Sequence, residues 1–372
     1  MEQANRGPSR RRPPTVKDVA ERAGVSWMTV SNVVNQKPSV RPATRRKVEA
    51  AISELGYRNS RAGQQLRSGR TNILALALPD LRTPYFAALA HEIIGVAEER
   101  GYTVLIAETK SSPERERHAA RGFDTQLADG VILRPDSLDS ERVLDSTGQM
   151  PLVLLGEGTR EVELDHVTLD NAGSGREATA HILSLGRRAP LFLGAREEMQ
   201  FGPGWQRFTG FRSALEEAGL DAAAAPPVDV RSYGRAPGAA AVEDLLRRGV
   251  TFDALVCATD LIAIGAMQAL RRAGAAIPDD VAVLGWDGTL EGEFANPSLT
   301  TIGVDISRVA HEAVEMMIRR IEDPGADPEV VEVPQELIIR ESTAGVVALA
   351  PSPPAGSGVQ PEGSVGVQGE AP

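Results

Sequence analysis

From residue 71 onward, short continuous runs of apolar residues alternate with longer segments in which apolar positions recur every three or four residues. Runs of the first kind are typical of buried β-strands, and the second pattern is typical of amphipathic helices. Strands are therefore predicted at Ile73–Leu78, Thr103–Ala107, Val131–Arg134, Leu152–Leu155, Val167–Leu169, Pro190–Leu193, Ala254–Ala258 and Val281–Trp286. Helices are predicted between them at Phe86–Arg100, Gly175–Leu185, Trp205–Ala218, Leu261–Ala273 and Arg308–Ile321.

Apolar strands that alternate with helices predict an α/β core built on parallel, doubly wound sheets. The segment 71–343 is too long for one sheet of this type, so we expect two lobes. In such sheets, ligands bind in the crevice beyond the carboxyl ends of the strands. The sequence therefore predicts a ligand cleft in a two-lobed core.

The stretch before this core carries three short helical segments. A capping box opens the first helix at Thr15, and Gly24 is suited to the left-handed turn that follows it. Ser26 is a good N-cap for the second helix. The third helix is expected to begin at Pro42 and to stop at Gly56. These signals predict a small three-helix unit.

The second of these helices has two contrasting faces. Val30, Val33 and Val34 fall on one face, because they are spaced by three and four residues. The opposite face carries Trp27, Met28, Thr29, Ser31, Asn32 and Asn35. A short helix with amide, hydroxyl and aromatic groups outward suits the major groove of DNA. The alternative is an ordinary helical hairpin in a small domain.

Three polar segments surround the folded parts. Residues 1–14 form a basic, proline-rich arm, and residues 344–372 are rich in Gly, Pro, Ala and Ser, so both are predicted to be disordered. Residues 59–70 form a linker whose conspicuous apolar residue is Leu66. We expect this linker to become helical when a partner covers Leu66. The alternative is a flexible tether whose leucine packs on the core.

The charge is divided unevenly along the chain. The whole chain carries a formal charge of −11, but residues 1–70 hold 15 basic and 5 acidic residues, a net of +10. The remainder therefore carries −21. A basic head on an acidic body indicates a DNA-binding module joined to a part that DNA repels.

Other features restrict the compartment and the class of protein. Cys257, the single cysteine, lies in an apolar run and is expected to be buried, which excludes a disulfide framework within one chain. The N-terminus lacks the apolar segment of a signal peptide, and no run approaches the ~20 residues of a membrane span. The sequence therefore predicts a soluble, cytoplasmic protein associated with the nucleoid.

One motif allows an enzyme to be considered. Gly173 to Ala178 has GxGxxA form between a short strand and a helix, the context of a dinucleotide site. The signal is weak, because it fixes three positions in a chain with 36 glycines. The five histidines show no metal spacing, and neither a Walker sequence nor a G-x-S-x-G elbow is present. We therefore expect no catalysis, no cofactor and no metal.

A colinear series of motifs spans residues 15–343. The head carries Thr15–Ser26, Thr29–Asn35, Thr44–Val48 and Leu55–Tyr57; Leu66 and Arg67–Arg70 follow; the core carries Leu78–Phe86, Asp170–Asn171, Arg207–Phe211, Thr259–Asp260, Ala263–Gly265, Ile277–Val281, Gly285–Asp287, Leu299–Thr301 and Arg340–Thr343. These motifs resemble LacI-type transcriptional repressors. The resemblance implies a helix-turn-helix head at 15–58, a hinge at 59–70 and a periplasmic-binding-protein-like core at 71–343. It implies an N-lobe of about 71–168 plus 302–335 and a C-lobe of about 169–301 plus 336–343.

The resemblance also implies the partners. The family reads a pseudo-palindromic operator as a homodimer, and a small metabolite in the cleft, often a sugar, switches the affinity for DNA. The absence of C-terminal leucine heptads argues against a coiled-coil tetramer. A secreted solute-binding protein, the alternative for the core, would lack the basic head.

The resemblance assigns the DNA contacts. Base or phosphate contacts are expected from Thr15, Ser26, Trp27, Met28, Thr29, Ser31, Asn32 and Asn35, and Leu66 is the expected minor-groove wedge. The chain departs from many family members at Asn32, where an arginine is common. Because an Asn side chain pairs with adenine whereas Arg pairs with guanine, we expect the half-site to differ at that base pair.

The resemblance and the strand ends together nominate ligand contacts. Arg207 and Asp287 align with effector-binding residues, and an Arg–Asp pair can hold vicinal hydroxyl groups. Thr259 and Asp260 end another strand. The full set of predicted effector-binding residues is Asp80, Tyr85, Glu157, Arg207, Tyr233, Thr259, Asp260, Trp286 and Asp287. In this set, Asp80 is expected in the cleft or at the hinge between the lobes. Tyr85, Tyr233 and Trp286 are expected to stack on a sugar ring.

Overall fold

The computed structural model describes residues 14–34, 39–57, 70–124, 127–136, 150–156, 164–200 and 202–344. Three predicted site residues, Asn35, Leu66 and Glu157, lie outside the described residues. The predicted arm, hinge and tail lie almost wholly outside them as well.

The head consists of α1 (Val16–Ala23), α2 (Trp27–Val34) and α3 (Pro42–Leu55). Both predicted stops are present, because Gly24 and Gly56 adopt left-handed backbone conformations at the ends of α1 and α3. A small apolar core joins the three helices, and its buried members are Val19, Ala20, Val30, Val33, Val48 and Ala51. The predicted apolar face of α2 thus faces this core, with Val34 half-buried at its margin.

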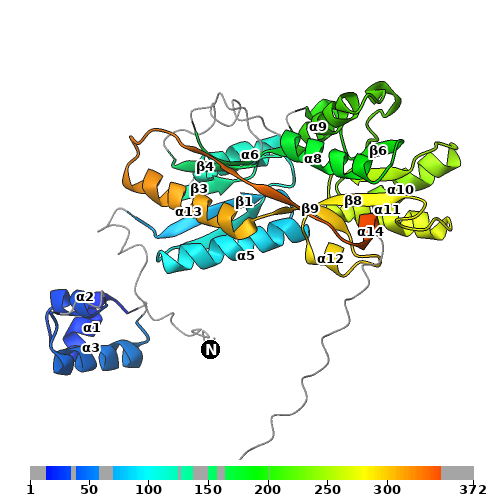
Figure 1. Ribbon diagram of the computed structural model, residues 1–372. Coiled ribbons are helices and arrows are strands. Elements are labelled where there is room, and N and C mark those ends of the chain that lie inside the picture. Colours follow the sequence, from blue (N-terminus) through cyan, green and yellow to red (C-terminus); the bar gives the residue numbers. More distant parts are fainter. Residues whose placement is uncertain are drawn as a thin grey trace, which may run out of the picture.

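The first lobe is built on a six-stranded, wholly parallel sheet with the order β10-β5-β4-β3-β1-β2. Its strands are β1 (Ile73–Leu78), β2 (Thr103–Glu108), β3 (Gly130–Leu133), β4 (Leu152–Leu155), β5 (Asp165–Leu169) and β10 (Val330–Val333). Helices α5 (Pro84–Glu99) and α13 (Ile306–Glu322) pack together on this sheet (Figure 1). A second apolar cluster, which includes residues of α6 (Pro113–Ala120), lies between that helix and the sheet.

The second lobe is built on a five-stranded sheet with the order β11-β9-β8-β7-β6. Its strands are β6 (Pro190–Leu193), β7 (Ala254–Cys257), β8 (Ala282–Asp287), β9 (Thr300–Val304) and β11 (Gln335–Ile338), and only the β9–β11 pair is antiparallel. The helices are α8 (Asn171–Ser184), α9 (Pro203–Glu217), α10 (Arg235–Arg247), α11 (Asp260–Arg272), α12 (Leu290–Glu293) and α14 (Glu341–Ala344). Short 3-10 turns lie at Gly122–Asp124, Glu197–Met199 and Ala222–Ala224.

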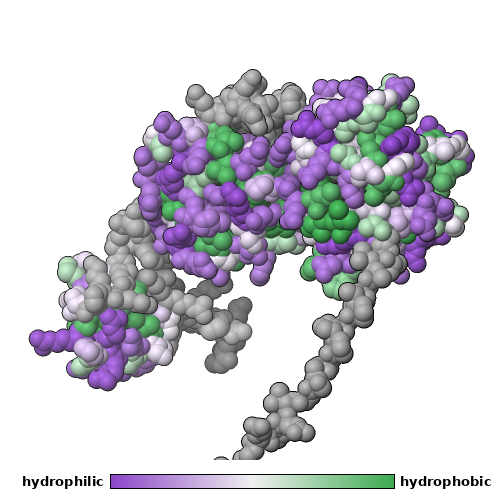
Figure 2. Space-filling view, viewed as in Figure 1, coloured by the Kyte–Doolittle hydropathy of each residue, from purple (hydrophilic) through white to green (hydrophobic). Residues whose placement is uncertain are grey.

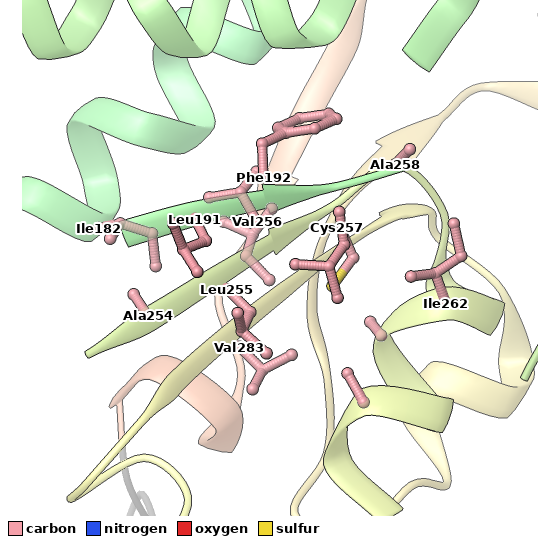
Figure 3. Packing of buried hydrophobic residues seen from close by; sticks show 14 of the residues in the cluster. Ile182, Leu191, Phe192, Ala254, Leu255, Val256, Cys257, Ala258, Ile262 and Val283 are labelled. Carbon is pink, nitrogen blue, oxygen red and sulfur yellow. The ribbon is translucent and has the colours of Figure 1, made fainter. Parts of the chain in front are cut away.

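The core of the second lobe is continuous through its sheet. Figure 3 shows Ile182 of α8 and Ile262 of α11 reaching the strands from opposite sides, with Phe192 and Val256 between them. Cys257 is fully buried in this cluster, as predicted, and burial raises the pKa of its thiol. The predicted parallel, doubly wound fold is therefore confirmed in both lobes.

The structure adds elements that the apolar pattern does not reveal. The strands β9, β10 and β11 and the helices α6 and α10 are absent from the predictions, because their sequences are polar or interrupted. β9 pairs with β8 as far as Gly303, so the chain enters the first lobe after Val304, about three residues later than the predicted crossing near residue 301. The chain crosses between lobes at three places, near residues 170, 305 and 334. Within the described residues, no helix is long and apolar enough to span a membrane.

Candidate functional site

The outward face of α2 presents two large apolar side chains to solvent. Trp27 is 53% exposed and Met28 is 57% exposed, although both belong to residue types that are usually buried. Ser31 and Asn32 lie half-buried further along the helix. An exposed aromatic and thioether pair beside polar groups gives this helix a surface suited to contact with base edges and methyl groups.

Two of the predicted DNA-contacting hydroxyl groups, those of Thr15 and Ser26, also cap helices, and the hydroxyl of Thr29 contacts that of Ser26. Ser26 Oγ accepts a hydrogen bond from the backbone N–H of Thr29 at 3.1 Å and lies 2.9 Å from Thr29 Oγ1. Thr15 forms the predicted capping box, because its N–H and hydroxyl both donate to Asp18 and its Oγ1 accepts from the backbone of Asp18. These bonds orient α1 and α2, so the three side chains have a structural role in the free head.

A cleft of about 750 Å³ lies between the two lobes. It opens at the carboxyl ends of the parallel strands, as predicted, since residues that directly follow β1, β3 and β4 line it. Six predicted residues line the cleft, namely Asp80, Tyr85, Arg207, Tyr233, Thr259 and Asp287. Two predicted residues, Asp260 and Trp286, do not line it.

Arg207 is fixed in place by groups of the second lobe. Its Nε donates to Asn171 Oδ1 at 2.7 Å, and its Nη1 donates to the carbonyl oxygen of Ala258 at 2.5 Å. The guanidinium lies 4.5 Å from the ring centroid of Trp286, a cation–π contact. Trp286 is fully buried, so the prediction that it stacks on a ligand is replaced by a supporting role beneath Arg207.

Asp260 is a buried structural carboxylate. It accepts hydrogen bonds from Thr301 Oγ1 at 2.6 Å and from the backbone and hydroxyl of Thr289 at 2.7 and 2.9 Å. Burial raises the pKa of Asp260 from 3.8 to about 6, against the opposing effect of these donors. The predicted ligand contact is therefore wrong: Asp260 joins the start of α11 to the loop after β8 and to β9.

Asp287 and Asp80 line the cleft from opposite lobes. Asp287 ends β8 with a backbone φ of 107°, a conformation that costs a non-glycine residue about 1–3 kcal/mol and that gathers at binding sites. Asp80 follows β1 and is held by Arg82, whose Nη2 donates to Asp80 Oδ2 at 2.7 Å. The Arg82 hydrogen bond lowers the pKa of Asp80. A carboxylate from each lobe therefore lines the cleft.

The cleft also contains polar side chains that the sequence patterns did not single out. They are Arg82, Ser111, Arg134, Asp136, Arg196, Arg231, Ser232 and Arg235. Arg134 directly follows β3, so its strand-end position was a usable signal. Arg196, Arg231 and Arg235 lie around β6 and the unpredicted α10, where neither periodicity nor a motif points to a site.

The glycine motif considered for a dinucleotide is occupied by helix packing. A Cβ on Gly175 would lie 2.2 Å from the carbonyl oxygen of Arg207, because α9 covers this part of α8. The N-terminus of α8 is capped by Asp170, whose Oδ1 accepts from the Gly173 N–H at 2.8 Å. These glycines therefore permit close contact between two helices.

Comparison with known proteins identifies both parts of the chain. Residues 15–60 match the family described as bacterial regulatory proteins, lacI family, and residues 179–343 match the periplasmic binding protein-like domain. The chain is 33% identical over 347 residues to the HTH-type transcriptional regulator CelR of Thermobifida fusca, covering 90% of this chain and 99% of the relative. The chain belongs to the LacI family of transcriptional regulators.

Other LacI-family proteins align over similar lengths. The ribose operon repressor of Halalkalibacterium halodurans is 31% identical over 335 residues, covering 89% of this chain and 97% of the relative. The lac repressor dimer bound to operator and the anti-inducer ONPF superposes with a TM-score of 0.79 at 26% identity, covering 89% of this chain and 99% of that one. A CelR–cellobiose complex superposes with a TM-score of 0.65 at 31% identity, covering 88% and 99%. The LacI-like fold, with a helix-turn-helix head and a two-domain α/β core, is therefore established.

Proposed function

We propose that this LacI-family regulator is a repressor that binds a pseudo-palindromic operator as a homodimer and responds to a carbohydrate in its inter-lobe cleft. The observation that carries the proposal is the presence, in one chain, of an exposed DNA-reading face on α2 and a polar cleft lined by both lobes. Operator binding places the protein in the cytoplasm, where the chromosome is.

The head supports recognition of base edges. Trp27 and Met28 are exposed at the start of α2, the part of a recognition helix that meets the major groove. Asn32 lies on the same helix and is proposed to pair with adenine. Arg46 and Lys47, exposed on α3, add to the positive charge of the head. Asn35 and the minor-groove contact of Leu66 remain part of the proposal.

Two exposed apolar areas of the core support a homodimer. Leu105 and Ile106 are 46% and 39% exposed on β2, which is an edge strand of the first sheet. In the second lobe, Leu290 and Phe294, at α12, are 70% and 80% exposed. Figure 2 shows apolar surface gathered near α12. Exposed apolar patches on both lobes of one core are typical of a subunit interface.

The cleft supports a polyhydroxylated ligand. Asp287 at the end of β8 offers an acceptor and Arg207 on α9 offers a donor, while Tyr85 and Tyr233 offer ring faces. The relatives include a ribose operon repressor and a regulator solved with cellobiose, which favours a carbohydrate. Glu157, which lies outside the described residues, remains a further proposed contact.

The lobe connections suggest how the ligand acts on DNA. Leu169 and Val304 line the cleft next to two of the three crossings between lobes. A ligand that binds a closed arrangement of the lobes more tightly would shift the lobes toward that arrangement. The predicted hinge at 59–70 directly precedes β1 of the first lobe in the sequence, so the movement can reach it. We propose that the order of this hinge carries the change to the heads.

The operator-reading part of this proposal is tested by selecting bound sequences from a random DNA pool. The full-length protein should return an inverted repeat, and the Asn32→Ala variant should lose discrimination at one base pair per half-site, by about 1–3 kcal/mol. Ser53→Ala, an exposed polar residue on α3, is the matched control and should leave the selected sequence unchanged. A selected site without inverted symmetry contradicts the dimeric operator, and a guanine preference insensitive to Asn32→Ala contradicts the role of that residue.

The effector-binding part is tested by thermal shift against a panel of sugars, followed by operator binding with each sugar that stabilises the protein. Arg207→Ala and Asp287→Ala should abolish both the shift and the change in DNA affinity. Failure of every sugar to stabilise the protein, with both variants still normally regulated in cells, contradicts ligand control through this cleft.

A further inference from the structure

The cleft carries an excess of positive charge. Among the described residues, the lining includes six arginines, namely Arg82, Arg134, Arg196, Arg207, Arg231 and Arg235, and three aspartates, Asp80, Asp136 and Asp287. The core as a whole is strongly acidic, so this local reversal does not follow from overall composition. A neutral sugar needs hydrogen-bond donors and acceptors in similar numbers. Such a ligand would leave the excess positive charge of the cleft without a counter-charge.

Two of the arginines are neutralised by carboxylates of the protein. Arg82 forms a short ion pair with Asp80 at 2.7 Å, and Arg235 lies 3.4 Å from Glu291 on α12. Arg207 donates to the uncharged oxygens of Asn171 and Ala258. Among the described residues, Arg196 and Arg231 are the remaining arginines that line the cleft from the second lobe.

Arg196 and Arg231 lie on neighbouring segments of the second lobe. Leu193 at the end of β6 forms a parallel bridge with Val228, and the Gly194 N–H donates to the Val228 carbonyl oxygen at 2.9 Å. Arg196 and Arg231 each follow this bridge by three residues, and both line the cleft. The two guanidinium groups therefore approach the cleft from adjacent segments of one wall.

Neither arginine donates a hydrogen bond to a carboxylate of the described residues, unlike Arg235, which donates to Glu291. Arg231 is exposed and makes no hydrogen bond or ion pair with any residue of the described chain. Arg196 Nε lies 3.5 Å from Asp229 Oδ1 but is buried without a hydrogen-bond partner in the described part. Two guanidinium groups in the same wall of the cleft, one of them with an N–H group that lacks a partner, are suited to binding an oxyanion.

We propose that Arg196 and Arg231 bind an oxyanion of the effector, so that the ligand of this cleft is an anionic sugar, either a phosphate ester or a sugar carboxylate. The proposal rests on the proposed function, because it names the class of effector for the same cleft. Arg207 and Asp287 would hold the hydroxyl groups of the same molecule, while the arginine pair selects its charged group.

The anion site is tested on the full-length protein with the anions alone. Inorganic phosphate represents a sugar phosphate, acetate represents a sugar carboxylate, and chloride at equal ionic strength is the reference. The anion that matches the effector should raise the unfolding temperature by about 2–4 °C at ten times its Kd. Arg231→Gln and Arg196→Gln should each weaken that Kd at least tenfold, whereas Arg212→Gln, an exposed arginine of α9 outside the cleft, should leave it unchanged.

Equal rises of the unfolding temperature in chloride, phosphate and acetate overturn the proposal. A rise that is the same in Arg196→Gln, Arg231→Gln and Arg212→Gln also overturns it, because the anion is then adventitious or bound to the basic head. A second measurement separates this failure from failure of the proposed function. Calorimetric titration compares neutral, uronate and 6-phosphate forms of glucose and galactose. Preference for the neutral forms contradicts the arginine pair and leaves the proposed function standing. Tight binding of a charged form without any effect on operator binding supports the arginine pair and contradicts the switch.

Discussion

Arg207 is held by a carbonyl oxygen, an amide oxygen and an indole ring, none of which carries a charge. These contacts fix its position in the wall of the cleft. Asp260 shows the opposite arrangement. Its carboxylate is buried and its acceptor capacity is used by Thr289 and Thr301 inside the lobe. Burial and hydrogen-bond partners, rather than residue type, decide that Arg207 lines the cleft and that Asp260 supports the lobe from inside.

The buried carboxylate makes stability depend on pH. Because the pKa of Asp260 is raised from 3.8 to about 6, its favourable contribution is complete below pH 3.8 and is lost as the pH rises to about 6. The free energy of unfolding of the wild type, relative to Asp260→Asn, should therefore fall by up to about 3 kcal/mol between pH 4 and pH 7. Urea unfolding across this range measures the difference.

Asp327→Asn, an exposed carboxylate near the end of the core, is the control for removal of one surface charge. If the free energies of unfolding of the Asp260→Asn and Asp327→Asn variants differ from that of the wild type by amounts that do not change with pH, the buried carboxylate does not titrate in this range.

Helix pairs of the second lobe pack through glycines. A Cβ on Gly210 of α9 would lie 1.9 Å from the carbonyl oxygen of Ala172 in α8. The pair α10 and α11 repeats this arrangement, since a Cβ on Gly265 would lie 1.9 Å from the carbonyl oxygen of Arg235. The α8–α9 contact determines where Arg207 sits, and the α10–α11 contact determines where α10 begins, directly after the Arg231–Gly234 segment.

Gly210→Ala should destabilise the second lobe by about 1–3 kcal/mol, because backbone atoms in the facing helix cannot move away from the added methyl group. Gly95→Ala is the matched substitution. Gly95 lies inside α5 and has open space where a Cβ would point, so an alanine there should stabilise by up to about 1 kcal/mol. Denaturant midpoints of the two variants should move in opposite directions, and a shift in the same direction contradicts this interpretation of the α8–α9 contact.

The whole chain separates a basic head from an acidic core. An acidic core limits nonspecific contact with DNA. In the proposed homodimer, two heads acting together would supply the specific affinity. The exposed apolar residues on β2 and at α12 give the two lobes of the core a surface through which a second copy can join. In the proposed dimer, the interface, the two clefts and the two heads would belong to one assembly.

Phe294→Glu should weaken dimerisation at least a hundredfold, because a twofold interface loses the side chain twice and gains two buried charges. Leu246→Glu, an exposed leucine on α10, is the control. Sedimentation equilibrium measures the dimer affinity, and operator affinity should fall with it. An unchanged dimer in Phe294→Glu, or equal loss in both variants, contradicts the assignment of α12 to the interface.

The sequence alone determined the features that depend on nearby residues. The capping box at Thr15, the left-handed stop at Gly24 and the apolar face of α2 rest on contacts within about four positions, so the pattern was sufficient to predict them. The same holds for β1, whose continuous apolar run is buried along its whole length. The motifs that resemble the LacI family added Arg207 and Asp287, which both line the cleft.

Only the tertiary structure decided which distant residues meet. Asp80 and Asp287 are more than two hundred positions apart, and their presence in one cleft depends on the order of strands in two separate sheets. Trp286 and Asp260 have the same strand-end position as true cleft residues, yet packing turns both toward the interior. Arg196 and Arg231 carry no signal in the sequence, because they are paired by the single bridge between Leu193 and Val228. Local interactions set the elements, while burial and strand pairing across the whole chain set the chemistry of the cleft.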